Sequence, residues 1–115
     1  MISGIFSAVF TSNQNRMGCG IAIFSDNVIH GGDASYYYRG KYKFDGSNQV
    51  SGTIDVVKYS TLQNSIFGPL DSFRLILNGI AILNDQAFEL SGAVEGRPDF
   101  IITISLEKQD ELIEA

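Results

Sequence analysis

The segment from Tyr36 to Phe44 alternates between two kinds of side chain. Its even positions are aromatic or glycine, and its odd positions after Tyr37 are basic. Successive side chains of a strand point to opposite faces, so this alternation predicts a strand with one aromatic and one basic face. Turn signals flank it, Gly31-Gly32-Asp33 before and Asp45-Gly46 after. The segment therefore predicts an antiparallel sheet with one face in a core.

Strand patterns recur along the rest of the chain, and helical periodicity is nearly absent. They cover residues 2–10, 17–24, 28–30, 50–56, 72–79, 87–94 and 100–106, whereas residues 60–70 break the alternation. Segment 17–24 is apolar on both faces, so the sequence does not determine which of its faces points inward. The short spacing predicts eight strands joined mostly by tight turns.

Glycine occupies the inward positions of several expected strands, at Gly40, Gly52, Gly79 and Gly92. Glycine inside a strand is unfavourable, and strongly coiled strands around a narrow interior explain its repeated use. We therefore predict an all-β fold, an eight-stranded antiparallel up-and-down barrel of the lipocalin type, over a sandwich or an open sheet. The predicted inward set is Tyr38, Tyr42, Ile54, Val56, Phe73, Leu75, Leu90 and Ile102.

Length and charge limit the function classes. With 115 residues the chain suits one domain, expected over 1–107, with an acidic tail over 108–115. The net charge of −5 argues against nucleic acid as a partner. No apolar run is long enough to cross a bilayer, and the first residues do not form a signal peptide. These features predict a cytoplasmic protein without a membrane or nucleic-acid partner.

Residues that could carry chemistry are isolated. His30 and Cys19 are the only histidine and cysteine, and Cys19 is expected to be a buried, inert thiol in its apolar strand. Several aspartates fall at expected turns, where Asp33 is predicted to cap backbone amides and the adjacent Gly31 and Gly32 to supply positive φ. We predict no enzyme activity, no catalytic residues, no metal site and no cofactor.

The inward aromatic side chains allow two interpretations. They either fill the core or line a ligand cavity, because eight-stranded barrels hold packed side chains or one small ligand. Core filling is favoured, and the alternative function is a carrier of a small apolar ligand. The candidate lining residues are Phe6, Tyr36, Tyr38, Tyr42 and Phe73.

Outward positions carry apolar residues as well. Val57, Ile76 and Ile101 are predicted to face solvent on neighbouring strands, where several together suggest a covered patch. An isologous homodimer through the barrel wall is the expected explanation.

Several segments together resemble a known family. The chain resembles the GrlR-type negative-regulator family, named for a repressor of type III secretion gene expression in enteric pathogens. The resemblance implies a lipocalin-like barrel, a dimer and sequestration of a transcriptional activator, without enzyme activity or DNA contact by the barrel. It rests on the opening Gly4-Ile5-Phe6, on Gly18-Cys19-Gly20-Ile21, Gly31-Gly32-Asp33 and Tyr36-Tyr37-Tyr38-Arg39-Gly40, and on residues 65–73.

The hairpin after the aromatic strand is the candidate partner-binding segment, with Lys43, Asp45, Gly46 and Ser47. The resembled regulator has an acidic run there, whereas this chain keeps one acid. The expected function is a non-enzymatic regulatory module that binds a transcriptional activator or another protein.

Overall fold

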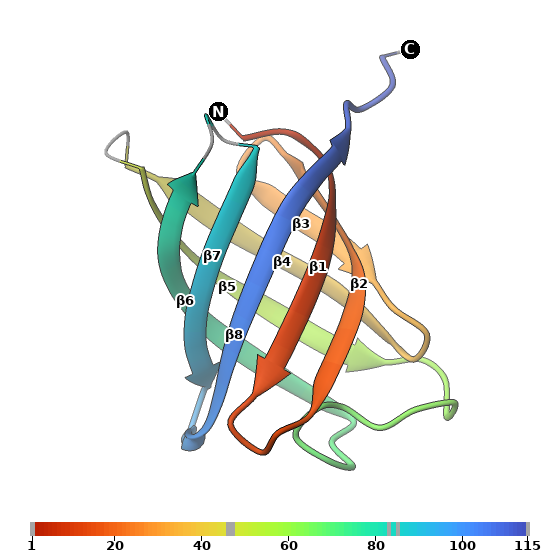
Figure 1. Ribbon diagram of the computed structural model, residues 1–115. Coiled ribbons are helices and arrows are strands. Elements are labelled where there is room, and N and C mark those ends of the chain that lie inside the picture. The colour runs from red at the N-terminus through yellow and green to blue at the C-terminus, as the bar shows by residue number, and fades with distance from the viewer. Residues whose placement is uncertain (1, 46–47, 83, 85, 115) are drawn as a thin grey trace.

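The computed structural model describes residues 2–45, 48–82, 84 and 86–114. These residues form a closed antiparallel barrel in which each strand pairs with the next and the last pairs with the first (Figure 1). The prediction of an eight-stranded up-and-down barrel is confirmed. The strands are β1 (Gly4–Ser12), β2 (Met17–Ser25), β3 (Val28–Gly32), β4 (Tyr36–Phe44), β5 (Gln49–Lys58), β6 (Ser72–Ile82), β7 (Ala87–Val94) and β8 (Arg97–Asp110).

Strands β4 and β5 pair in the register that the alternation predicts. Tyr38 lies opposite Val56 on the inner face, and Arg39 lies opposite Asp55 on the outer face. The whole predicted inward set belongs to the core or packs against it. Asp55 hydrogen bonds with Arg74 of the next strand at 2.7 Å, and this guanidinium lowers the pKa of the carboxyl. The outer basic strip therefore belongs to a charged surface that extends over β6.

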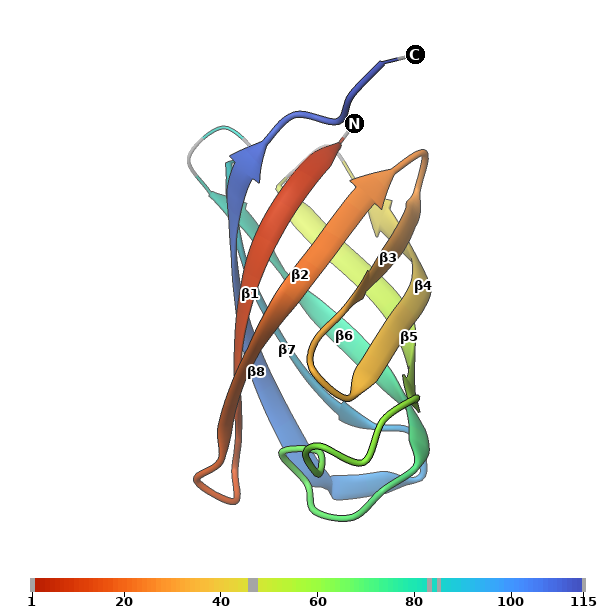
Figure 2. The same cartoon turned by 90° about the vertical axis from the view of Figure 1, so that its right-hand side faces the viewer.

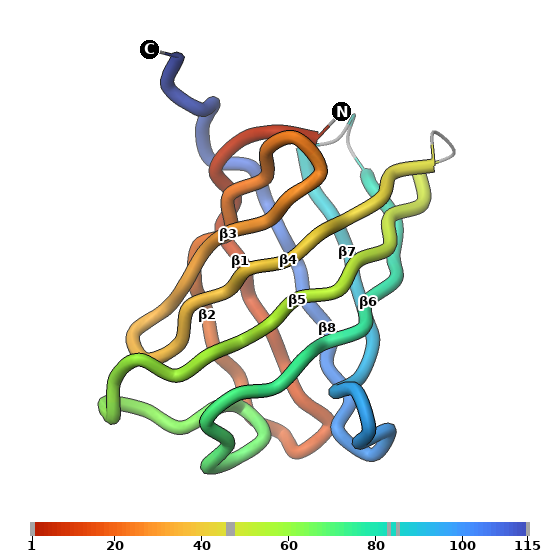
Figure 3. The backbone as a smooth tube through the Cα atoms, turned by 180° about the vertical axis from the view of Figure 1, so that it is seen from behind, coloured from red at the N-terminus to blue at the C-terminus, as the bar shows by residue number. Residues whose placement is uncertain are grey.

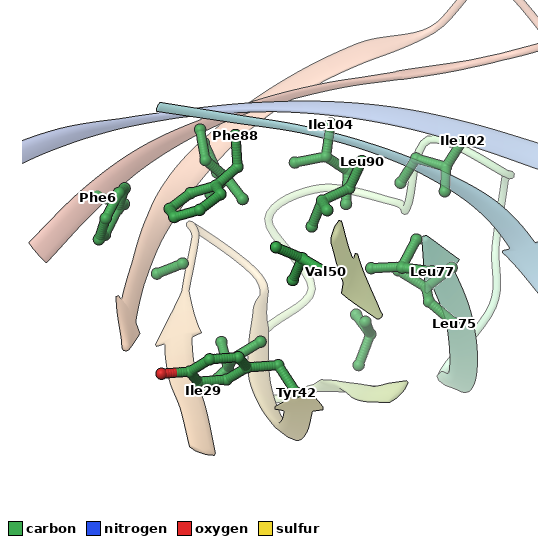
Figure 4. Close-up of a cluster of buried hydrophobic side chains, with 14 of the residues drawn as sticks. Phe6, Ile29, Tyr42, Val50, Leu75, Leu77, Phe88, Leu90, Ile102 and Ile104 are labelled. Atoms are coloured by element: carbon green, nitrogen blue, oxygen red, sulfur yellow. The ribbon is translucent and has the colours of Figure 1, made fainter. Parts of the chain in front are cut away.

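The turns beside the N-terminus lie at one end of the barrel, and the long connection between β5 and β6 lies at the other (Figure 3). At the end near the N-terminus, four aromatic rings fill the interior with ring centroids 5.0 to 5.7 Å apart. These rings are Phe6, Phe24, Tyr42 and Phe88, and we call them the aromatic cluster. Figure 4 shows Phe6, Phe88 and Tyr42 among the buried apolar side chains of this core. The Tyr42 hydroxyl donates to the carbonyl of Ile2 at 2.6 Å and so joins β4 to the N-terminal segment at this end.

Strand β2 turns its even positions inward. Ala22 and Phe24 are buried, so Cys19 lies on the outer face opposite Val9 and is exposed. The prediction of a buried thiol was therefore wrong. An apolar strand of this kind has two apolar faces, and the large ring of Phe24 takes the inner one because it completes the aromatic cluster.

The Gly31-Gly32-Asp33 segment also differs from its prediction. Gly31 and Gly32 pair with β4 as the end of β3 and have no positive φ, so the predicted glycine turn is wrong. The turn begins at Asp33, whose carboxylate accepts the backbone N–H groups of Ser35 and Tyr36, each at 2.9 Å. The predicted capping role of Asp33 is thereby confirmed.

The last strand is longer than expected. β8 continues to Asp110, three residues past the expected boundary at residue 107, because Lys108 and Asp110 still pair with β1. Residues 111–114 follow without regular structure. In the described part of the chain, no helix has the length and apolarity needed to span a membrane.

Candidate functional site

The segment between β5 and β6, residues 59–71, crosses the end of the barrel away from the N-terminus (Figure 2). We call it the lid. The sequence predicts only a break in the strand pattern here, yet Ile66 and Phe67 are 8% and 4% exposed and belong to the core. The lid therefore closes the barrel with two apolar side chains.

Hydrogen bonds fasten the lid to three different parts of the barrel rim. Ser12 of β1 donates its hydroxyl to the carbonyl of Ile66 at 2.9 Å. The backbone N–H of Gln63 donates to the Ser35 hydroxyl at 2.8 Å. Tyr36 of β4 donates to the carbonyl of Leu70 at 2.5 Å. Ser12 and Ser35 are buried, and these bonds satisfy their hydroxyl groups.

Aromatic contacts hold the lid from the opposite side. The Phe67 ring stacks on Phe100 of β8, with centroids 5.2 Å apart, and meets Phe73 of β6 edge to face at 5.8 Å. The guanidinium of Arg97 lies 4.0 Å from the centroid of Phe100. Phe67 is thus the side chain that joins the lid to the β6–β8 wall.

Beneath the lid the barrel contains a cavity of about 110 Å³, counted as the space that water centres can occupy. One water needs roughly 10–15 Å³ on that measure, so the cavity has room for several waters or for a slender apolar group. Its walls are mostly apolar and come from both sides of the barrel, with aromatic rings such as Phe24 and Phe73 beside the aliphatic side chains. They include Ala8, Ile54, Val56, Leu75, Leu90 and Ile102.

A polar pair lies at one side of this cavity. Tyr38 donates its hydroxyl to the Asp33 carboxylate, and both residues line the cavity and are half-buried. Burial above all, together with the hydrogen bond to Asp33, raises the pKa of Tyr38. The phenol therefore stays protonated and remains a donor at neutral pH.

Gly20 of β2 makes space for the pair. A Cβ at this position would lie 2.8 Å from the Tyr38 hydroxyl and 3.2 Å from the Cβ of Asp33. Any larger residue would push the phenol or the carboxylate away. The sequence alone gave no sign of this role, because Gly20 lies in a strand whose inner face was undetermined.

The expected lining residues divide between the two ends of the barrel. Tyr36, Tyr38 and Phe73 line the cavity, whereas Phe6 and Tyr42 lie in the aromatic cluster. The burial of the lid residues Ile66 and Phe67 was not expected from the sequence. The available signal was an apolar pair inside an otherwise polar, irregular segment.

The expected dimer residues are not contiguous. Ile76 and Ile101 share one outer row through Ala93 and are 38% and 48% exposed. Val57 is half-buried and lies opposite Tyr37 instead. The Asp55–Arg74 ion pair stands between Val57 and that row.

The expected partner-binding hairpin is described only in part. Lys43 and Asp45 are exposed at the end of β4, and the Asp45 carboxylate accepts the N–H of Gln49 at 3.2 Å. Gly46 and Ser47 lie outside the described residues.

Across the described ranges, histidine, cysteine and acidic residues form no group that could hold a metal ion. His30 and Cys19 are both exposed on the outside of the barrel. No model of a known protein family matches the sequence, and the comparison with curated proteins finds no match either.

Proposed function

We propose that this barrel is a non-enzymatic binding domain for a small, mainly apolar molecule held beneath the lid. The observation that carries the proposal is the unequal filling of the interior. Aromatic rings fill the end near the N-terminus, whereas a partly open cavity lined mostly by apolar side chains remains at the lid end. Protein interiors are normally close-packed, so a cavity of this size in one half of a barrel suits a ligand.

The lid is the natural route into the cavity. It is attached by side-chain hydrogen bonds at Ser12, Ser35 and Tyr36 and by backbone bonds to the Ser35 carbonyl, whereas the walls are held by continuous strand pairing. Irregular segments open locally at lower free-energy cost than paired strands. A ligand can therefore enter without opening of the barrel wall.

Straight-chain primary alcohols test this function, with binding followed by amide chemical shifts of the ¹⁵N-labelled protein. We expect signals of cavity residues such as Ala8 and Leu90 to shift. Affinity should rise by at most about 0.8 kcal/mol for each added CH₂ group and level off once the chain fills the cavity. Absence of cavity shifts for every chain length would contradict the proposal.

Two matched variants locate the binding. Ala8→Leu adds volume inside the cavity and should weaken alcohol binding, whereas Ala87→Leu adds the same volume on the outside of β7 and should not. Equal affinity in both variants would place the alcohols elsewhere on the protein.

A second candidate function is a regulatory module that binds a protein, as the resemblance to the GrlR-type family implies. The observation that favours it is the exposed apolar surface of the outer wall. The row Ile76–Ala93–Ile101 is one such surface, and Val9 and Ile21 on β1 and β2 are also more than 40% exposed. A second copy of the chain is the partner that this surface suggests first, and a transcriptional activator is the partner that the resemblance implies.

A further inference from the structure

The polar pair at the cavity indicates which kind of apolar molecule fits. A carboxylate only accepts hydrogen bonds, and a phenol that has donated its single proton can likewise only accept. Tyr38 donates to Asp33, so the pair has acceptor capacity left and no donor. The carboxylate already accepts the N–H groups of Ser35 and Tyr36 on its other oxygen. An anionic group placed here would meet repulsion without a compensating donor.

The surroundings hold the pair in this arrangement. Gly20 supplies the space for the phenol oxygen, and Phe10 meets the Tyr38 ring edge to face at 6.5 Å. The raised pKa of Tyr38 means that its proton stays between the two residues at neutral pH. The folded structure therefore fixes both side chains of the pair as hydrogen-bond acceptors toward the cavity.

Resting on the proposed function, we propose that the cavity ligand is a slender apolar chain ending in a hydrogen-bond donor, with a primary amine preferred over an alcohol. The chain lies against the apolar walls and the donor meets the Asp33–Tyr38 pair. An ammonium is preferred because hydrogen bonds between two charged groups are stronger than those of a neutral hydroxyl.

Other polar groups of the lid provide the competing possibility. Gln63 and Asn64 also line the cavity, and the Lys58 ammonium donates to the Asn64 side-chain carbonyl at 3.4 Å. A ligand with an anionic head would be drawn to that side of the cavity. A preference for a cationic or for an anionic head group therefore shows which side of the cavity binds the head.

The experiment compares octylamine, octanol and octanoate, using amide shifts of the ¹⁵N-labelled full chain. We expect octylamine to bind at least about tenfold more tightly than octanoate, with the largest head-dependent shifts at Gly20 and Asp33. Octanoate binding as tightly as octylamine, or more tightly, would overturn the head-group inference and leave the proposed function standing. Failure of all three to shift cavity signals would overturn both.

Substitution of the acceptor completes the test. Asp33→Asn keeps an oxygen that can accept from Ser35 and Tyr36, removes the charge, and should abolish the preference for octylamine. Asp26→Asn makes the same change at the β2–β3 turn, at the other end of the barrel, and should keep it. A preference that survives Asp33→Asn would overturn the assignment.

Tyr38→Phe covers the case in which Asp33→Asn fails to fold. It removes the phenol oxygen while the carboxylate keeps its two backbone hydrogen bonds. The Asp33 oxygen that accepted from the phenol is then free to accept from the ligand, so octylamine should bind more tightly relative to octanoate than in the wild type. An unchanged ratio of octylamine to octanoate affinity would place the head away from the pair.

Discussion

Three tyrosines of β4 turn inward, and each of their hydroxyl groups has a hydrogen-bond acceptor. Tyr36 and Tyr42 donate to backbone carbonyls, and Tyr38 donates to a carboxylate. A buried hydroxyl without a partner costs free energy, so these acceptors decide that tyrosine is tolerated on the inner face. Burial is also the largest cause that raises the pKa of all three.

Alkaline pH should therefore destabilise the barrel. A folded-state pKa raised above the unfolded value of about 10 gives stability that is complete below pH 10 and lost as pH rises through the folded pKa. Chemical denaturation between pH 8 and 11.5 should show this loss, and it should be smaller in Tyr38→Phe. An identical alkaline loss in both proteins would contradict the role given to Tyr38.

At the scale of the strand, the inward glycines mark close backbone approach. A Cβ at Gly40 of β4 would lie 2.2 Å from the carbonyl oxygen of Thr53 on β5. The sequence pattern suggested strand coiling and a narrow interior as the reason for these glycines. The obstacle at Gly40 is the neighbouring strand itself, because the coil of the barrel brings the two backbones together.

Gly40→Ala should lower the free energy of unfolding by about 1–3 kcal/mol, because the methyl group must push β5 away. Gly32→Ala is the matched control on β3, where the nearest atom to the new Cβ lies at 3.1 Å and a small shift accommodates it. Thermal and urea unfolding of both variants measure the difference. Equal losses would remove close approach as the reason for glycine at position 40.

At the scale of the whole molecule, the barrel wall presents an apolar row that a monomer leaves in water. Ile76 and Ile101 lie in this row with Ala93 between them, flanked by polar positions such as Thr53 and Thr103. A two-fold dimer would bury the same row on both copies and leave no apolar row exposed for further association. A stable interface of this kind buries on the order of 1,200 Å² or more.

We expect the wild-type chain to be a dimer by light scattering at micromolar concentration, and Ile101→Asp to be a folded monomer, because the charge would be buried in the interface. Ile21→Asp places the same change at a similarly exposed position on β2 and should leave the dimer intact. A wild-type mass of one chain would refute the dimer. Dissociation by Ile21→Asp alone would move the interface to the β2 wall.

The local pattern of the sequence determined where the strands lie and, for most of them, which side chains face the interior. Alternation from Tyr36 to Phe44 predicted both the inner tyrosines and the outer basic strip, and the short hairpin set Arg39 opposite Asp55. These properties depend on neighbouring residues, since side-chain direction has period two and turn length sets register. The closed barrel followed from repetition of the same pattern.

Only the tertiary structure decided the face of β2, the lid and the cavity. Cys19 lies outside because Phe24 completes a cluster with Phe6 and Phe88, which come from distant parts of the chain. The lid is fastened by pairs such as Ser12 and Ile66, 54 residues apart. A cavity is what remains after all side chains around the closed barrel have packed, so no stretch of consecutive residues can encode it.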